Sequence, residues 1–503
     1  MPHPIFGRTT EIQEIEENCF NNGMPRAALM EKAGLKSFVI FKELYPKHDF
    51  LKILIFVGPG HNGGDALVIA RELLLSGYKT YVFVPEAKLK KLTEEHLNYY
   101  LFLGGQVFSS LNNIYDIDVI IDGLFGFGLN RNLEQKFIDI IETINIAGKE
   151  IVSLDLPSGM HADFGTALGA CIQATHTFCL GIYKYGLIQD YAVDYVGKLH
   201  FIDLGFKKNN LQVMALNQKT IQQLNKNIPV QKRNLNKYSN GVCLLFAGSN
   251  KYPGAGILSA RGAMASGAGY VQLCCTEETK YTFTTQIPDI ICSGLNDMLA
   301  QIERHIQNPN FSILCGSGLE DNNYLKLIIE KIYSLNSHFP CLILDASTLN
   351  EKNYLFIQKY KGQKILTPHM GEFSKIFPHI HEKMIKNEAH AVGPFSLDKI
   401  GAVQAAAKEI NGIVLLKGPH SVIGNAHGEV YVNIKSTSAL ARAGCGDVLS
   451  GYIAGLTAKG YSPFHAACFG VFEQCKTAIY LEEQFGTAYV CASNLAKQLE
   501  HEL

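Results

Sequence analysis

The residues best suited to chemistry in the first half of the chain are three aspartates, each in or beside a Gly-rich turn. Asp65 ends the run GHNGGD, Asp122 begins DGLFGFG and Asp155 begins DLPSG. Glycines let the backbone turn tightly and approach a ligand, and a carboxylate can bind a cation or move a proton. Taken singly, each aspartate can equally be a helix N-cap or a turn residue. Their recurrence at or just past strand ends favours a shared pocket.

Buried strands position these turns. Ile53–Val57 is an apolar run typical of a strand covered on both faces, and a helix is expected to start at Asp65. A strand, a Gly-rich turn and a helix start aim backbone N–H groups at an anion, although a purely structural turn remains the alternative. Strands alternating with helices predict a parallel α/β sheet that binds ligands beyond the strand ends. We expect further strands at 80–84, 119–121 and 151–154, and helices at 10–21, 25–44, 94–103 and 134–145.

Oxygen atoms near these strand ends are suited to a hard cation. Asn62, Asp122 and Ser158 offer an amide, a carboxylate and a hydroxyl oxygen. K⁺ and Mg²⁺ both prefer such ligands. The spacing alone does not choose between the two ions.

The second half repeats the pattern, and Asp447 is its clearest candidate for chemistry. In ARAGCGDVLSGYIAGL, residues 443–446 form a small-residue turn and Asp447 lies in the first turn of an apolar helix. Backbone N–H groups there can hold a phosphoryl group in transfer while Asp447 takes a proton from a hydroxyl. A simple turn and cap is the alternative, just as Lys417 and His369 can be ordinary structural residues. No GxxxxGK[ST] motif is present, which excludes a P-loop enzyme.

Length and composition bound the function. A chain of 503 residues predicts two or three domains, and 47% hydrophobic with 18% charged residues is typical of a soluble globular protein. A net charge of −1 argues against nucleic-acid binding and a membrane surface, and no apolar run is long enough to cross a bilayer. The acidic N-terminus does not resemble a signal peptide, and 13 cysteines without a CxxC pair predict free thiols. We therefore expect a cytoplasmic protein.

The first-half motifs resemble those of a known family. GPGHNGGDA, DGLFGFGLNRN and LDLPSGMHADFG, with LMEKAG upstream, are similar to the epimerase domain of NAD(P)H-hydrate repair enzymes. Those enzymes act on NADHX and NADPHX, nicotinamide cofactors damaged by the addition of water. The resemblance implies that Asp155 is the acid/base that interconverts the R and S hydrates, and that Asn62, Asp122 and Ser158 bind K⁺. It further implies hydrate contacts from His61, Asn62, Gly63, Gly64, Asp65, Gly126, Phe127, Gly128, Leu129, Asn130, Arg131, Asn132 and Asp155.

The second-half motifs AGSNKYPGAG, TPHMGEF, LLKGPHSVIG and AGCGD resemble the ADP-dependent NAD(P)H-hydrate dehydratase domain, which has a ribokinase-like fold. The resemblance implies phosphorylation of the hydrate hydroxyl by the nucleotide, followed by phosphate elimination, with Asp447 as the base. ADP would be a co-substrate, with Mg²⁺ as a further candidate cofactor. The implied hydrate contacts are Ala255, Gly318, His369 and Asp447, and the implied nucleotide contacts are Lys417, Gly418, Pro419, His420, Ser421 and Gly446.

Several residues depart from the family patterns. In the first half, His61, Ala66 and Phe127 replace an asparagine, a glycine and a small hydroxyl residue, and none of these removes a proposed cation ligand. In the second half, Arg442 and Cys445 alter the turn before Asp447. Glu320 replaces a glycine and Ser347 replaces an acid. A carboxylate facing phosphates weakens nucleotide binding, whereas an outward-facing Glu320 matters little.

The leading hypothesis is a two-site repair enzyme: an N-terminal Rossmann-like three-layer α/β epimerase domain at 1–210, a linker rich in Asn, Gln and Lys at 211–235, and a ribokinase-like α/β dehydratase domain at 236–503. Within the linker we expect a helix near 219–225. The alternatives are a ribokinase-like small-molecule kinase with an accessory domain, and a nucleotide-binding scaffold with a degenerate site. We expect NADHX, NADPHX and ADP as partners, no nucleic acid or membrane, and a homo-oligomer of unspecified size.

Overall fold

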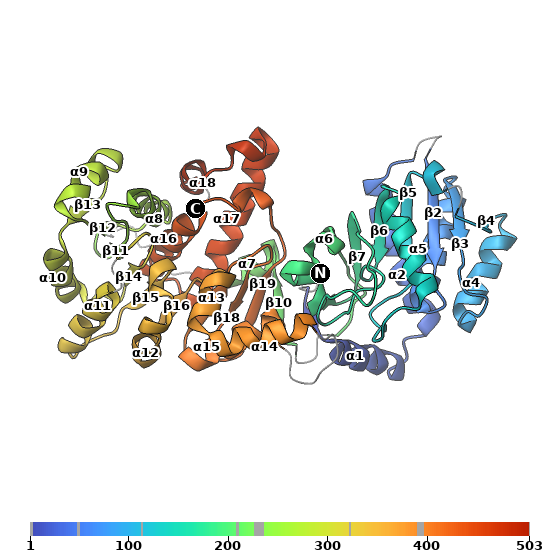
Figure 1. Ribbon diagram of the computed structural model, residues 1–503, viewed down its shortest axis with the longest axis horizontal. Coiled ribbons are helices and arrows are strands. Elements are labelled where there is room, and N and C mark those ends of the chain that lie inside the picture. The colour runs from blue at the N-terminus through green and yellow to red at the C-terminus, as the bar shows by residue number, and fades with distance from the viewer. Residues whose placement is uncertain are drawn as a thin grey trace. The chain divides into compact units, whose positions relative to one another are not determined.

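The computed structural model describes residues 4–47, 51–111, 114–207, 211–225, 236–320, 323–389 and 397–501 (Figure 1). The chain divides into two compact units. The first comprises residues 1–214 with 387–398, and the second comprises residues 215–386 with 399–503. Each unit is built around its own sheet.

The first unit is built on a seven-stranded parallel sheet with the order β4-β3-β2-β5-β6-β7-β9. The alternating residues of its central strand explain why both faces are covered. Ile53, Ile55 and Val57 pack in one apolar cluster, whereas Leu54 and Phe56 pack in another. The strands are β2 (Lys52–Val57), β3 (Lys79–Phe83), β4 (Gln106–Phe108), β5 (Val119–Gly123), β6 (Glu150–Leu154), β7 (His176–Leu180) and β9 (Lys198–Ile202).

Helices α2 and α3 supply the first of these clusters and α5 supplies the second. The sheet is therefore the middle of three layers, as the strand and helix alternation predicts. The helices of this unit are α1 (Thr9–Asn21), α2 (Arg26–Leu44), α3 (His61–Leu75), α4 (Lys91–Phe102), α5 (Gln135–Ile146) and α6 (Val193–Val196), with 3₁₀ turns at Ile114–Asp116, Tyr185–Ile188 and Asp190–Ala192.

A short parallel pair ties the N-terminal segment to this unit. Strand β1 (Phe6–Gly7) pairs with β8 (Tyr183–Lys184), and the register places Gly7 opposite Lys184. Helix α1 follows directly after β1 and buries Ile12 and Ile15 against Ile5 and Ile182. The sequence does not reveal this pairing because two-residue strands carry no periodicity.

The second unit contains a ten-stranded sheet with the order β10-β19-β18-β17-β16-β15-β14-β11-β12-β13. Neighbours from β13 to β17 are parallel, and β17, β18 and β19 form an antiparallel meander. The strands are β10 (Val213–Leu216), β11 (Val242–Phe246), β12 (Tyr270–Cys274), β13 (Ile291–Ser293), β14 (Phe311–Cys315), β15 (Cys341–Leu344), β16 (Lys364–Leu366), β17 (Ile413–Leu416), β18 (Val422–Gly424) and β19 (Val430–Asn433).

Helices α8 and α16 of this unit pack closely because small residues line their contact. A Cβ on Gly262 would lie 2.2 Å from the carbonyl oxygen of Val448, and one on Gly451 would lie 2.0 Å from that of Ser259. The helices are α7 (Gln218–Asn225), α8 (Pro253–Ala265), α9 (Glu277–Gln286), α10 (Leu295–His305), α11 (Asn323–Ser334), α12 (Glu351–Lys359), α13 (Met370–Ile376), α14 (Pro378–Ala389), α15 (Lys399–Ile410), α16 (Cys445–Ala458), α17 (Pro463–Phe485) and α18 (Ala492–Leu499), with 3₁₀ turns at Ala346–Thr348, Ser438–Leu440 and Thr487–Tyr489.

Two details differ from the sequence-based expectation. Helix α3 begins at His61, one turn before Asp65, because Gly60 in an extended conformation already caps it. The segment expected to link the domains contains the unexpected strand β10 besides α7, which is the helix expected near 219–225, and its residues 226–235 lie outside the described residues. Strand β10 buries Val213, Ala215 and Leu216, but it is too short for the apolar pattern of the sequence to predict a strand.

The cysteines are free thiols, as predicted, and most of them are buried. Within the part of the chain that the structure describes, no helix combines the length and apolar character needed to span a membrane.

Candidate active sites

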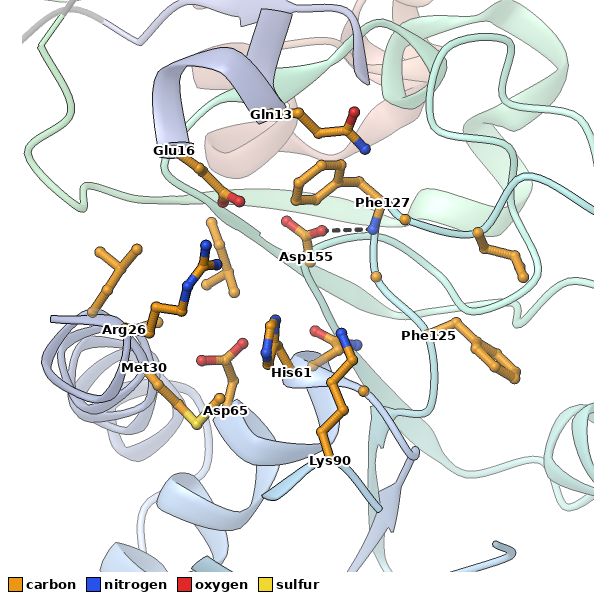
Figure 2. A pocket seen from close by; sticks show the side chains of 18 of the residues that line it. Gln13, Glu16, Arg26, Met30, His61, Asp65, Lys90, Phe125, Phe127 and Asp155 are labelled. Carbon is orange, nitrogen blue, oxygen red and sulfur yellow. Dashed lines mark hydrogen bonds between the residues drawn. The ribbon is translucent and has the colours of Figure 1, made fainter. Parts of the chain in front are cut away.

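The first unit contains a cavity of about 1170 Å³ beyond the carboxyl ends of its strands. Its wall is built from residues that directly follow β2, β5 and β6, among them Gly60, Leu124 and Asp155. Parallel strands end at one edge of a sheet, so side chains that follow them converge there. Figure 2 shows Asp155, Asp65 and His61 around this space.

Asp155 is constrained by both its backbone and its hydrogen-bond partners. It follows β6 with a left-handed backbone (φ +69°), which is uncommon for a residue with a side chain. Its Oδ2 accepts a hydrogen bond from the backbone N–H of Phe127 at 3.0 Å, and its Oδ1 pairs with Nζ of Lys184. Both carboxylate oxygens are therefore held by donors, and the group is fixed toward the cavity.

Lys184 is buried, with 1% of its side chain exposed. Its Nζ also donates to the carbonyl oxygen of Leu180 at 3.1 Å and lies 5.6 Å from the ring centroid of Phe127. Burial lowers the pKa of Lys184, but Asp155, with smaller effects of Cys179 and Glu16, outweighs burial and leaves that pKa raised. The lysine therefore stays charged. The ring that lies near its charge belongs to Phe127, one of the residues that differ from the family pattern.

Asp122 and Ser158 lie beside the cavity but do not line it. The carboxylate of Asp122 accepts hydrogen bonds from the hydroxyl of Ser158 at 2.6 Å, the hydroxyl of Ser153 at 2.7 Å and the N–H of Ser158 at 2.9 Å. Burial raises the pKa of Asp122 above its usual value, and these hydrogen bonds offset only part of that rise. Among the described residues, no lysine, arginine or histidine forms an ion pair with it. Such a buried carboxylate can be stabilised by a cation bound to its oxygens and to the neighbouring hydroxyl oxygens.

Most of the hydrate contacts expected in the first half face the cavity, but some do not. A Cβ on Gly63 would lie 2.0 Å from the carbonyl oxygen of Gly58, and one on Gly64 would lie 2.5 Å from the Met30 side chain, so these glycines permit packing. Asn132 also lies outside the wall. The expected residues in the wall are His61, Asn62, Asp65, Gly126, Phe127, Gly128, Leu129, Asn130, Arg131 and Asp155.

Sequence reasoning missed the contributions of α1, α2 and the loop before α4. Glu16 of α1, Arg26 of α2 and Lys90 line the same cavity as Asp155. Arg26 pairs with Glu17 at 2.9 Å, and burial together with Lys90 and Arg26 lowers the pKa of His61. The spacing of apolar residues in 10–21 predicts a helix. It does not show which of the four glutamates in that helix line the cavity.

In the second unit, Asp447 lies in the first turn of α16, as predicted. Gly444 precedes the helix with φ +90°, where a Cβ would lie 2.5 Å from the Leu258 side chain. The carbonyl oxygen of Cys445 accepts a hydrogen bond from Nε2 of Gln474 at 2.7 Å. The turn before Asp447 is thus held by α8 and α17, although its sequence differs from the family pattern.

An acidic cluster surrounds the lysine of this site. Nζ of Lys417 lies 2.9 Å from Oδ1 of Asp345 and 3.9 Å from Oε2 of Glu372. Burial and the charge of Asp345 raise the pKa of Asp447 to about 7, against the opposing effects of Lys417 and a hydrogen bond from Ser317. A carboxyl group poised near neutral pH suits a general base. Asp345 and Glu372 were not singled out in the sequence.

The remaining predicted residues of this site come from separate segments. A Cβ on Gly318 would lie 2.5 Å from Cβ of Ala255, so these two positions meet. His369 caps α13 and is 60% exposed, with Nε2 3.3 Å from Glu372. A Cβ on Gly446 would lie 3.4 Å from Nζ of Lys417. In the neighbouring loop, Gly418 and Pro419 are exposed, whereas His420 and Ser421 are buried.

The departures in the second half do not disrupt this arrangement. Glu320 is exposed, and the guanidinium of Arg442 donates to the carbonyl oxygen of Ala488 at 2.9 Å. The hydroxyl of Ser347 donates to the carbonyl oxygen of Gly316 at 2.9 Å. Glu320 therefore faces solvent, and the other two replacements are hydrogen-bonded to backbone carbonyl groups.

Two family models match the chain. Residues 26–186 match the model described as YjeF-related protein N-terminus, and residues 243–501 match the model described as NAD(P)H-hydrate dehydratase. The bifunctional NAD(P)H-hydrate repair enzyme of Thermosynechococcus vestitus is 35% identical over 96% of this chain and 94% of its own length. The chain belongs to this family of bifunctional NAD(P)H-hydrate repair enzymes.

The chain is also similar to a second repair enzyme and to a solved structure. The repair enzyme of Synechocystis is 35% identical over 89% of this chain and 85% of its own length. A crystal structure of the ADP/ATP-dependent NAD(P)H-hydrate dehydratase from Bacillus subtilis is 24% identical, covers 56% of this chain and 95% of that chain, and has a TM-score of 0.46.

Membership of the repair-enzyme family confirms several sequence-based predictions. The fold class, the order of the two catalytic regions and the identification as a bifunctional repair enzyme are confirmed. The residue roles, the potassium ion, the cytoplasmic location and the domain boundaries stay predictions.

Proposed function

We propose that the cavity of the first unit is the epimerase site, in which Asp155 is the acid/base for the R and S hydrates of NADH and NADPH. The single observation that carries this role is the fixed orientation of Asp155, held by Lys184 and the N–H of Phe127 while its carboxylate faces the cavity. A positioned carboxylate is a suitable proton acceptor. Loop 126–131 then forms one wall for the substrate.

Charged residues of the same cavity support a dinucleotide substrate. Its volume of about 1170 Å³ exceeds that of a typical drug-sized pocket. Arg26, Lys90 and Arg131 line it and can bind phosphate groups. A substrate with a diphosphate, and in NADPHX a further phosphate, matches this set of cations.

We propose that Asn62, Asp122 and Ser158 hold K⁺ in the first unit. Bound there, the ion would supply positive charge beside loop 122–128 and stabilise its conformation. Asp122 is the anionic ligand, and Ser158 links it to the loop because its hydroxyl also accepts the N–H of Phe125 at 2.8 Å. Asn62 donates its amide to the carbonyl oxygen of Leu154 at 3.3 Å, which orients it between two of the strand ends.

We propose that the second unit dehydrates the S hydrate with ADP as co-substrate. Asp447 takes the proton of the hydrate hydroxyl, and the N–H groups at the start of α16 stabilise charge on the phosphoryl group in transfer. Lys417 and the loop to Ser421 bind the nucleotide with Gly446, while Ala255, Gly318 and His369 contact the hydrate. Mg²⁺ would accompany the nucleotide and neutralise its phosphates.

The experiment measures recovery of reduced-nicotinamide absorbance from a mixture of S and R hydrates, with and without ADP. We expect ADP-dependent recovery of both epimers at a rate above spontaneous epimerisation. Recovery of the S form alone would contradict the epimerase assignment. No recovery unless a separate dehydratase is added would contradict the dehydratase assignment.

A further inference from the structure

Helix α1 forms a fixed wall of the proposed epimerase cavity. The N–H and hydroxyl of Thr9 both donate to Oδ1 of Asp163, at 2.7 and 3.0 Å. The preceding strand β1 pairs with β8, which carries Lys184. The segment that supplies α1 is therefore attached to the strand that positions the partner of Asp155.

Glu16 projects from α1 into this cavity. Figure 2 shows its carboxyl group directed toward the space that Asp155 faces, and both residues line the cavity. The charged groups that act on Glu16 are Asp155, Lys184 and Arg26, and it in turn acts on Asp65 of α3. Burial, with a contribution from Asp155, raises the pKa of Glu16 to about 7, whereas Lys184 and Arg26 lower it.

The two carboxyl groups have different surroundings. Asp155 has a buried lysine on one oxygen and a backbone N–H on the other, so both of its oxygens accept charge-assisted or backbone hydrogen bonds. Glu16 has no lysine or arginine ion pair among the described residues and is turned toward another carboxylate. Two carboxyl groups with such different surroundings on one cavity are suited to act as an acid and base pair.

We propose that Glu16 is a second catalytic residue of the epimerase cavity, the proton donor that works opposite the base Asp155. This role rests on the proposed epimerase function. It also gives the N-terminal helix, which lies before the matched family region 26–186, a part in the chemistry.

The pair accounts for epimerisation at a carbon that bears both a hydroxyl and the ring nitrogen. Glu16 gives its proton to the hydroxyl, the C–O bond breaks, water leaves, and the nitrogen lone pair forms a C=N⁺ bond. A water then adds to the opposite face and gives a proton to Asp155. One proton has moved from Glu16 to Asp155, and exchange with solvent restores both groups. Nothing is oxidised or reduced.

The test compares wild type, Glu16→Gln, Glu16→Asp and the control Glu43→Gln in epimerase assays from pH 5.5 to 9, with the spontaneous rate subtracted. Glu43 is exposed on α2 and does not line the cavity. We expect kcat of Glu16→Gln to fall by about 100-fold, since general acids contribute that much or more. Wild-type activity should fall above pH 7, where Glu16 loses its proton, and Glu16→Gln should lose this alkaline limb.

Glu16→Asp should retain the limb at a reduced rate, and Glu43→Gln should behave as wild type. Glu16→Gln that retains the wild-type rate and alkaline limb would overturn the proposal. So would a rate loss in which Glu16→Gln keeps the limb, because that pattern indicates a structural role. Thermal denaturation checks that the variants fold. Wild-type protein without epimerase activity would instead refute the proposed function of the first unit.

Discussion

Both candidate sites contain a lysine near an aspartate, but the lysine pairs with a different aspartate in each. In the first unit, Lys184 forms an ion pair with Asp155, which is the candidate acid/base itself. In the second unit, Lys417 is bound mainly by Asp345, and the pKa of Asp447 is raised to about 7 by burial and by that neighbour. Two aspartates can therefore differ in how they exchange protons, although their side chains are identical. The position of the lysine decides which carboxylate it stabilises.

The largest expected effect concerns Asp447 of the second unit. Asp447→Asn removes the proposed base, so we expect ADP-dependent dehydration to slow by about 100- to 10,000-fold. The epimerase rate should not change. Appearance of NADH from the S hydrate measures the effect, with Asp297→Asn, at an exposed position of helix α10, as the matched control. An Asp447→Asn variant with the control's activity would show that Asp447 is not the base of the second site.

In the first unit, Lys184→Met should affect both activity and stability. It leaves the Asp155 carboxylate without its buried partner, and breaking such a pair costs about 3 to 5 kcal/mol. We expect the lower end, because Asp155 faces a cavity that can admit water. Chemical denaturation gives the free energy of unfolding, and an epimer assay gives the rate. Dehydration of the S hydrate should persist; an unchanged epimerase rate would show that the pair is only structural.

Removal of the cation should affect the first unit more moderately. We expect the epimerase rate to fall about tenfold, a difference of 1.4 kcal/mol, when K⁺ is replaced by a larger organic cation at equal ionic strength. Asp122→Asn should abolish the response to K⁺, because it removes the anionic ligand. Rates that are equal in all cations, for both proteins, would argue against a potassium site.

The pH dependence of dehydration tests the environment of Asp447. A base must be unprotonated, so kcat should rise with pH through about 7, the raised pKa of Asp447. Asp345→Asn removes a charge that raises this pKa, so the midpoint should move to lower pH by about half a unit or more. Profiles at saturating ADP provide the measurement. A midpoint that stays in place would show that Asp345 does not set the pKa of Asp447.

The smallest effect is expected for Glu320. Its side chain is exposed, so Glu320→Gly should change the KM for ADP by less than about twofold, in line with other surface charges. Steady-state kinetics at varied ADP provide the measurement. A large decrease in KM would show that Glu320 faces the nucleotide after all.

The sequence predicted the strands and turns that carry Asp155 and Asp447, because apolar runs and Gly-rich ends identify parallel strands and helix starts. It did not predict their partners. Lys184 follows Asp155 by 29 residues in a stretch without a motif, and its position depends on the pairing of two-residue strands. Asp345 and Glu16 have ordinary sequence surroundings, and only the folded chain shows which charged groups they approach.

The central proposal is that one chain carries two independent active sites. Its most direct test uses Asp155→Asn and Asp447→Asn, singly and mixed, on equal amounts of S and R hydrates with ADP. We predict that Asp155→Asn recovers only the S fraction before spontaneous epimerisation intervenes and that Asp447→Asn recovers almost none. The mixed variants should recover both epimers as wild type does. Full recovery of the R hydrate at the wild-type rate by Asp155→Asn alone would contradict the account.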